Sequence, residues 1–242
     1  MAAERLVEAP VFVLSTVRSG STLLRVLLDS HSQIRAPHEL HLQTIEVRLT
    51  QFYTRTAMDG LDLDTAELEH LLWDRLLHRE LERSGKRIIV EKTPGNVFGW
   101  RRLRRCWPDA RFVFLLRHPA SILESMAESP DGAAPPNKIW ILLAHLGNLA
   151  DAMRSLTGHT VRYEELVRRP AEVTSDLCDF LGVPWERGML AYGDRDHGPV
   201  ASFLGDSAAK IRSGAIQPPR PLPDPGAIPE ALREACRDWG YL

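Results

Sequence analysis

The sequence predicts an α/β fold of the P-loop type, with three layers: a central parallel sheet flanked by helices on both sides. Two observations predict it. Short apolar runs rich in β-branched and aromatic residues alternate along the chain with longer segments of helical periodicity. The first of these runs also leads directly into a glycine-containing turn that resembles a phosphate-binding loop. The 242 residues, of which 44% are hydrophobic, suffice for one α/β core.

The expected strands are short apolar runs that stop at polar turns. They are VFVL (11–14), RIIVEKTP (87–94), RFVFLLRHP (111–119) and HTVRYEEL (159–166). In a parallel sheet, ligands bind at the carboxyl ends of the strands. We therefore expect the turns at 15–20, 91–95 and 117–119 to open at one edge of the sheet.

The expected helices have apolar residues at helical spacing. They cover residues 22–28, 65–83, 100–107, 138–156 and 171–181, and Gly182 is expected to cap the last one. The basic segment WRRLRRCW (100–107) could suggest a nucleic-acid patch. We interpret it instead as a helix that buries Trp100, Leu103 and Trp107 and leaves its arginines in solvent. The proline-rich segment 213–230 predicts an extended arm, attached to a single domain of residues 1–242.

Bulk composition narrows the class of partner. The 30 basic and 32 acidic residues give a net charge of -2, which argues against a nucleic acid or an anionic membrane as the main partner. The three cysteines are far apart and show neither metal spacing nor a disulfide framework. The N-terminus lacks the apolar core of a signal peptide, and no apolar run is long enough to span a bilayer. We expect a cytoplasmic protein without a metal; the sequence does not predict its oligomeric state.

The stretch STVRSGSTLLR (15–25) is a phosphate-binding loop without its lysine. Compared with G-x-x-x-x-G-K-[ST], Ser15 stands at the first glycine, Gly20 and Thr22 match, and Ser21 takes the place of the lysine. The backbone amides from Gly20 to Leu23 can still converge on an anion at a helix N-terminus. Further donors come from the side chains of Arg18, Ser19, Ser21 and Thr22. Because the lysine and a Walker B aspartate are missing, the loop suits a phosphate ester better than metal-assisted phosphoryl transfer.

A second anion site is expected after the strand at 111–119. Arg117 stands at the end of that strand, where a charge needs a partner. Ser125 follows eight positions later, on a helix that Pro119 can start. Two separate anion sites, with no lysine for a triphosphate, indicate a nucleotide that carries phosphates at both ends of its ribose.

At this point the motifs RSGSTLLRVLLDSH, EKTP, LLRHPASILES and VRYEEL together resemble the PAPS-dependent sulfotransferases, over residues 11 to about 183. HELHL and CDFLGV are most similar to bacterial enzymes akin to the sulfotransferase domains of olefin-forming polyketide synthases. The protein-tyrosine sulfotransferases are a more distant likeness. The resemblance implies the donor 3′-phosphoadenylyl sulfate (PAPS), with adenosine 3′,5′-bisphosphate (PAP) as the product. It places the 5′-phosphosulfate at the Gly20 loop and the 3′-phosphate at Arg117 and Ser125. Lys210 and Arg212 of KIRSG would belong to a late loop that closes over the donor.

Sulfuryl transfer needs a general base at the acceptor and positive charge at the leaving oxygen, but no metal. Glu39 and His41, in APHELHLQ (36–43), are the candidate bases, and either one could instead orient the other. The resemblance aligns Glu39 with the catalytic glutamate of the tyrosine-directed enzymes. Lys92 is the candidate on the leaving side; the alternative is a surface pair with Glu91.

The expected function is therefore transfer of a sulfuryl group from PAPS to a hydroxyl of a small-molecule or carrier-bound natural-product acceptor. The acceptor itself is not predicted. Two alternatives stay open. One is a P-loop kinase acting on a small molecule, with Lys92 supplying the missing lysine and Mg²⁺ bound. The other is a nucleotide-binding module without catalytic activity.

Overall fold

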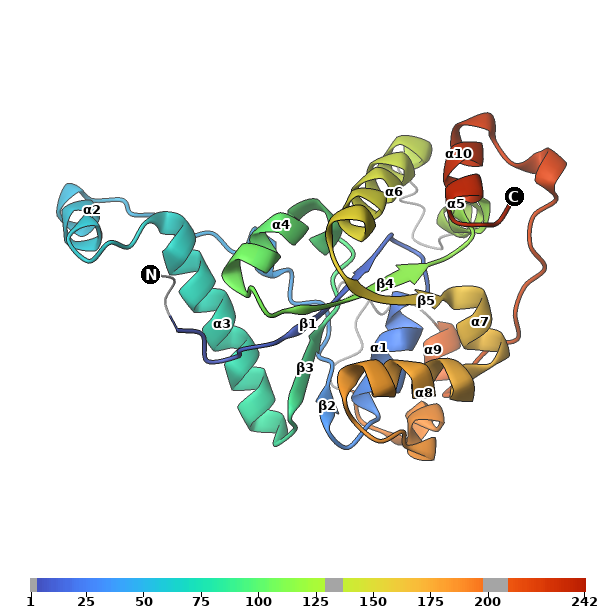
Figure 1. Ribbon diagram of the computed structural model, residues 1–242, viewed down its shortest axis with the longest axis horizontal. Coiled ribbons are helices and arrows are strands. Elements are labelled where there is room, and N and C mark those ends of the chain that lie inside the picture. The colour runs from blue at the N-terminus through green and yellow to red at the C-terminus, as the bar shows by residue number, and fades with distance from the viewer. Residues whose placement is uncertain (1–3, 129–136, 198–208) are drawn as a thin grey trace.

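The computed structural model describes residues 4–128, 137–197 and 209–242. Its centre is a five-stranded sheet with the strand order β2-β3-β1-β4-β5, in which every neighbouring pair is parallel. The strands are β1 (Val11–Ser15), β2 (Ile34–Arg35), β3 (Ile88–Glu91), β4 (Arg111–Leu116) and β5 (Gly158–Arg162). β1 lies in the middle, so the loop that follows it emerges between the ends of β3 and β4 (Figure 1).

The helices of the described residues alternate with these strands. They are α1 (Ser21–Asp29), α2 (Phe52–Asp59), α3 (Thr65–Ser84), α4 (Asn96–Cys106), α5 (Pro119–Ala127), α6 (Lys138–Ser155), α7 (Tyr163–Arg168), α8 (Pro170–Leu181), α9 (Ala209–Arg212) and α10 (Glu230–Asp238). Short 3-10 turns lie at Leu42–Thr44, Arg187–Leu190, Tyr192–Asp194 and Pro225–Ala227.

Two apolar layers cover the two faces of the sheet, because successive strand residues point to opposite sides. Phe12 and Leu14 of β1 face a layer that also contains buried residues of α3, α4, α5, α6 and α10. Val11 and Val13 face a layer that contains α1, α7 and α8. Figure 1 shows these helices on either side of the strands. The predicted three-layer α/β fold with a central parallel sheet is confirmed.

A strand is present in each of the four predicted runs, but the last one is shorter than predicted: β5 ends at Arg162, and residues 163–166 form the first part of helix α7 instead. The structure also adds β2, which has two residues and so left no periodic signal. Gly182 caps α8 in the left-handed conformation, with φ 72°, as expected. Trp100, Leu103 and Trp107 are buried, which confirms the interpretation of the basic segment as one side of a packed helix. That helix, α4, begins at Asn96, four residues before the predicted start.

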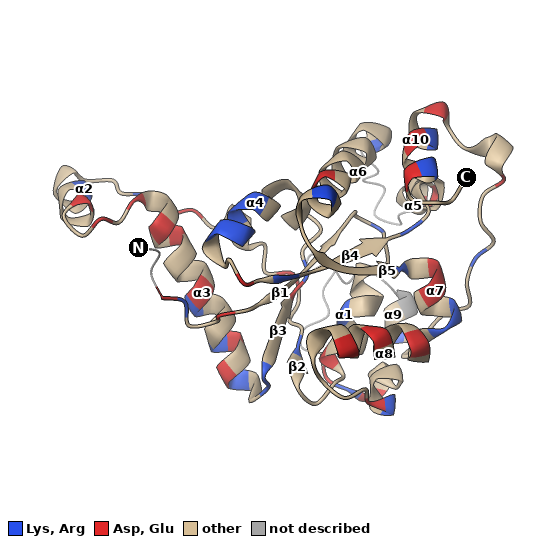
Figure 2. Cartoon of the chain, viewed as in Figure 1, with Lys and Arg blue, Asp and Glu red and all other residues tan. Residues whose placement is uncertain are grey.

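Charged residues lie over the surface of the protein, and the cysteines lie in its core. Basic and acidic residues are interspersed over most helices, with α4 mainly basic (Figure 2). All three cysteines are buried and unpaired. Burial raises the pKa of Cys106 to about 12 and that of Cys178 to about 11, so both remain thiols at neutral pH. Within the described ranges, no helix is both long and apolar enough to cross a membrane.

Candidate active site

The loop between β1 and α1 has the backbone of an anion site. Gly20 has φ 89° and Arg18 has φ 58°, so both residues are left-handed, and α1 starts at Ser21. The loop is held from within, because Ser19 Oγ donates to the Thr16 carbonyl at 2.8 Å. The first helical hydrogen bond runs from the Leu24 amide to the Gly20 carbonyl. The amides that precede Leu24 therefore stand at the helix N-terminus, where the helix dipole favours an anion.

Two hydroxyls beneath this loop support the same interpretation. Ser15 Oγ and Thr16 Oγ1 are both buried, and neither has a hydrogen-bond partner among the described residues. A buried hydroxyl without a partner is costly in a finished fold. Their position at the end of β1 fits a loop that completes its hydrogen bonds with a bound ligand.

The two anion sites predicted from separate motifs meet in the structure. Arg117 Nη1, from the end of β4, donates to the Arg18 carbonyl at 2.7 Å. Arg18 Nε donates to Ser125 Oγ, on α5, at 3.3 Å. The residues of the predicted 3′-phosphate site are thus bonded directly to the loop after β1, and the two predicted sites lie together at the carboxyl edge of the sheet.

Tyr163 joins this group from the start of α7. The guanidinium of Arg117 lies 4.6 Å from the centre of the Tyr163 ring, and the same ring packs against Gly20. Burial lowers the pKa of Arg117, although Tyr163 and Glu164 oppose the shift, and the nearby positive charges of Arg220 and Arg18 lower it further. No ion pair joins Arg117 to a carboxylate of the described residues. A half-buried cation beside a left-handed loop is therefore available to an anionic ligand.

The candidate catalytic residues form a second cluster, on the other side of β1. Lys92 Nζ lies 2.5 Å from Glu39 Oε1, and His41 Nε2 lies 3.4 Å from Glu39 Oε2. The Lys92 side chain is fully buried and that of Glu39 is 10% exposed, whereas His41 is 47% exposed. Lys92 therefore pairs with Glu39 and not, as in the alternative considered above, with Glu91 at the surface.

Glu91, which the sequence pattern did not single out, holds this cluster in place. Its carboxylate accepts hydrogen bonds from the Leu40 amide at 3.2 Å, from Thr93 Oγ1 at 2.6 Å and from Asn96 Nδ2. Thr93 Oγ1 in turn accepts from the amide of His41 at 3.2 Å. Burial raises the pKa of Glu91, and the hydrogen bonds from Thr93 and Asn96 oppose that shift. The signal in the sequence was an acidic residue closing an apolar strand.

The strand order explains how the two clusters relate. β3 and β4 pair with β1 on opposite sides, with Phe12 opposite both Glu91 and Phe112. Lys92 follows β3 and Arg117 follows β4, so the loop around Gly20 lies between them. Ser21 is buried in the first turn of α1 and Thr22 is half-buried beside it. A ligand held across this loop would have one end at Arg117 and the other near Lys92 and Glu39.

The late loop is held beside α1 by a chain of buried hydrogen bonds. Asp29 Oδ2 lies 2.9 Å from His197 Nδ1, and His197 Nε2 lies 2.9 Å from the Tyr192 carbonyl. Tyr192 Oη donates to the Ala215 carbonyl at 2.9 Å, just after KIRSG. Arg212 is exposed at the end of α9. The side chain of Lys210 lies outside the part of the structure that is described.

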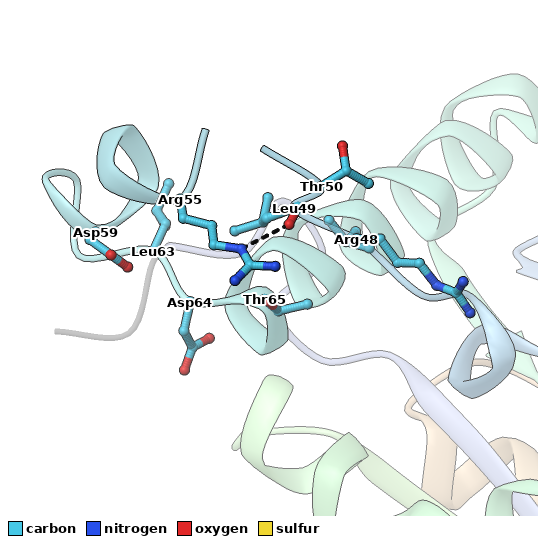
Figure 3. A pocket seen from close by; sticks show the side chains of 9 residues that line it. Arg48, Leu49, Thr50, Arg55, Asp59, Leu63, Asp64 and Thr65 are labelled. Atoms are coloured by element: carbon cyan, nitrogen blue, oxygen red, sulfur yellow. Dashed lines mark hydrogen bonds between the residues drawn. The ribbon is translucent and has the colours of Figure 1, made fainter. Parts of the chain in front are cut away.

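A hollow of about 600 Å³ lies elsewhere, between residues 47–50, α2 and the start of α3 (Figure 3). Arg55 Nε donates there to the Leu49 carbonyl at 3.0 Å. None of the predicted site residues lines the hollow. Among the described residues, no group of three or more His, Cys, Asp or Glu side chains has the arrangement of a metal site.

The fold defines the class of protein: a P-loop-type α/β protein with a parallel sheet, whose predicted anion-binding residues lie at the carboxyl edge of that sheet. A model of the Sulfotransferase family matches residues 10–187, so the chain belongs to that family. Over 99% or more of both chains, the structure is similar to two solved sulfotransferase domains. One is from the olefin synthase of Synechococcus PCC 7002 (25% identity, TM-score 0.67), and the other is from the curacin biosynthetic pathway (26% identity, TM-score 0.68).

The chain is also similar to two curated proteins. Protein-tyrosine sulfotransferase 1 of Danio rerio is 23% identical over 88% of this chain and 62% of its own length. The nodulation protein NoeE of Sinorhizobium fredii is 29% identical over 71% of this chain and 49% of its own length. The chain thus spans about half to three fifths of the length of these relatives. The family predicted from the motifs is confirmed.

Proposed function

We propose that this protein transfers a sulfuryl group from PAPS to a hydroxyl group of an acceptor. One observation carries the proposal: Arg117 donates to the carbonyl of Arg18, so the two predicted phosphate sites are parts of one site. The 5′-phosphosulfate would bind the amides at the start of α1, and the 3′-phosphate would bind Arg117 and Ser125. We also propose that residues 1–242 act as one catalytic domain, because Val7 and Trp239 share an apolar layer.

The charges around Glu39 suit the transfer step. Lys92 is the cation that would neutralise charge on the leaving oxygen, and Glu39 holds its ammonium in place. The acceptor hydroxyl loses its proton to the Glu39–His41 pair. His41 Nε2 is near Glu39 and also open to solvent, so the proton can leave the pair through the imidazole. The two side chains act together, and the activities of variants at each position will show which one takes the proton first.

We propose a small molecule or a carrier-bound intermediate as the acceptor class. The support is the likeness, at 25% and 26% identity over nearly the whole chain, to sulfotransferase domains of an olefin synthase and of the curacin pathway. The half-exposed His41 also leaves the acceptor side of the cluster open to solvent.

The test has two stages. First, calorimetry should show binding of PAP without Mg²⁺, and weaker binding of ATP with Mg²⁺. Second, a panel of hydroxyl acceptors with ³⁵S-labelled PAPS should give labelled product. Glu39→Gln and His41→Ala should each lower turnover while PAP affinity stays near the wild-type value. Full activity in both variants would show that the pair is not the base.

Two outcomes would favour the alternatives. Tighter binding of ATP–Mg²⁺ than of PAP, with phosphate transfer to a small molecule, would identify a kinase that uses Lys92. Binding of PAP without transfer to any acceptor would identify a nucleotide-binding module, in which Glu39→Gln would have no activity to remove.

A further inference from the structure

The proline-rich arm brings one more arginine to the donor site. The arm, defined here as residues 213–229, leaves α9, runs along one side of the molecule and leads to α10 (Figure 1). Arg220 is its only cationic residue. It lies between prolines, which favour an extended backbone and reduce the conformational freedom of the arm before any ligand binds.

Arg220 is anchored one helical turn from the predicted 3′-phosphate site. Its Nη1 donates to both carboxylate oxygens of Glu128, at 3.0 and 2.9 Å. Glu128 follows α5 directly and stands three positions after Ser125, whose hydroxyl accepts from Arg18. Residues three apart on a helix are neighbours, so the carboxylate that holds Arg220 belongs to the residue one turn after the serine that the 3′-phosphate would contact.

Arg220 is also close enough to Arg117 for their charges to interact. Burial and the positive charge of Arg220 lower the pKa of Arg117, and the carboxylates of Glu128 and Glu124 raise the pKa of Arg220. Of the carboxylates nearby, Glu164 already accepts from the His118 amide and from Tyr241 Oη. Glu128 is bonded to Arg220 itself. Three arginines therefore gather at this end of the site: Arg18 is bonded to Ser125, Arg117 is bonded to the Arg18 carbonyl, and Arg220 is bonded to Glu128.

The pair between Arg220 and Glu128 is easy to exchange. Both side chains are more than half exposed, at 52% and 56%. Exposed ion pairs of this kind contribute only about 0–1 kcal/mol. A phosphate offers arginine a bidentate and more strongly charged partner. An arginine held this loosely, beside a site for a dianion, can turn to the ligand at little cost.

We propose that Arg220 is a third arginine of the 3′-phosphate site, delivered by the proline-rich arm and held on Glu128 until the nucleotide binds. The inference rests on the proposed function and adds to it. It assigns the arm a role in donor selection, because only a nucleotide with a 3′-phosphate would draw Arg220 away from Glu128.

Calorimetry with PAP and with adenosine 5′-monophosphate, which lacks the 3′-phosphate, tests this role. Arg220→Ala should weaken PAP binding by about 10-fold or more, the scale of a lost charge-assisted contact, and should change the affinity for the monophosphate less than about 3-fold. Glu128→Gln should leave PAP binding unchanged or strengthen it, because it removes the competing carboxylate. Arg101→Ala is the matched control, since Arg101 is exposed and paired with Asp151.

The contrary outcomes are distinct. If Arg220 is only half of a surface pair, Arg220→Ala and Glu128→Gln will have the same small effect, and both will bind PAP like the wild type. That result, together with weakened PAP binding by Arg117→Ala, would overturn the role of Arg220 and leave the proposed function intact. Failure of the wild type to bind PAP would overturn the proposed function itself.

Discussion

Tyr163 fills the space beside Gly20: a β-carbon at Gly20 would lie 2.2 Å from Cδ2 of the Tyr163 ring. The guanidinium of Arg117 stacks over the same ring, 4.6 Å from the ring centre. One aromatic side chain thus joins the loop after β1, the end of β4 and the start of α7. Any change that moves the ring changes the geometry of both parts of the proposed nucleotide site.

Gly20→Ala should therefore impair nucleotide binding. The substitution would force a side chain into a left-handed backbone, at a cost of about 1–2 kcal/mol, and would also displace Tyr163. We expect PAP affinity to fall by at least about 10-fold, measured by calorimetry. Gly147→Ala is the control, because a β-carbon there meets no atom within 4 Å. Alanine favours the helix by about 1 kcal/mol, so this variant should bind PAP normally and unfold at a slightly higher temperature. Wild-type affinity in Gly20→Ala would contradict the packing described here.

Arg117→Ala should weaken PAP binding by about 2–4 kcal/mol, the usual scale for removing a buried charged partner. The side chain also bridges Arg18 and Tyr163, so its loss disturbs the loop as well as the charge. Arg117→Lys keeps the charge but not the planar guanidinium, and should recover only part of the affinity. Calorimetry with adenosine alone is the control, since a ligand without phosphates should be affected much less. Equal losses for adenosine and PAP would point to a folding defect.

The strands and the longer helices could be predicted because each one carries a strong local pattern. β4 is a continuous apolar run, and α6 repeats apolar residues at helical spacing. β2 could not be predicted, because two residues gain their structure only from pairing with β3. The same holds for α2: none of its residues is buried, so no apolar face marks it in the sequence.

The site was predictable where chemistry lies in a motif and not where it depends on tertiary contact. The residue types around Gly20 and Arg117 already indicated two anion sites. Their direct connection, through the Arg18 carbonyl, depends on the strand order. Glu91 supports Leu40, and Glu128 holds Arg220, across separations of 51 and 92 residues. No local pattern encodes contacts at that distance along the chain.

Substitutions of Lys92 and Glu39 should have non-additive effects on the free energy of unfolding. Removing one member of a largely buried ion pair leaves the other unpaired, at a cost of about 3–5 kcal/mol. We expect Lys92→Met and Glu39→Gln each to lower the free energy of unfolding. The double variant should lose clearly less than the sum of the two, as measured by urea denaturation. Arg101→Ala is the comparison for an exposed pair, with an expected loss below about 1 kcal/mol. Strict additivity in the double variant would show that the two side chains do not interact in solution.

Asp29 should stabilise the folded protein at neutral pH and lose this effect in acid. Burial alone would raise the pKa of this carboxyl, but hydrogen bonds from His197 and the Ala36 amide, with Lys86 and Arg35 nearby, hold it below its ordinary value. A carboxyl whose pKa is lowered by folding stabilises the protein above its unfolded pKa of about 3.9. That contribution disappears as the pH falls through the lower pKa of the folded state.

Asp29→Asn should therefore be less stable than the wild type at pH 7, by about 3 kcal/mol for the loss of a buried charged partner. The difference should stay constant from neutral pH to about pH 5 and shrink below about pH 4, because the wild-type carboxyl then becomes protonated too. Urea denaturation at several pH values measures this. Asp59→Asn, at the exposed end of α2, is the control and should show no such trend. A stability difference that does not change with pH would mean that Asp29 is not held as a carboxylate by His197. In that case the hydrogen bond between Asp29 and His197 would not be what fixes Tyr192, and with it the late loop, beside α1.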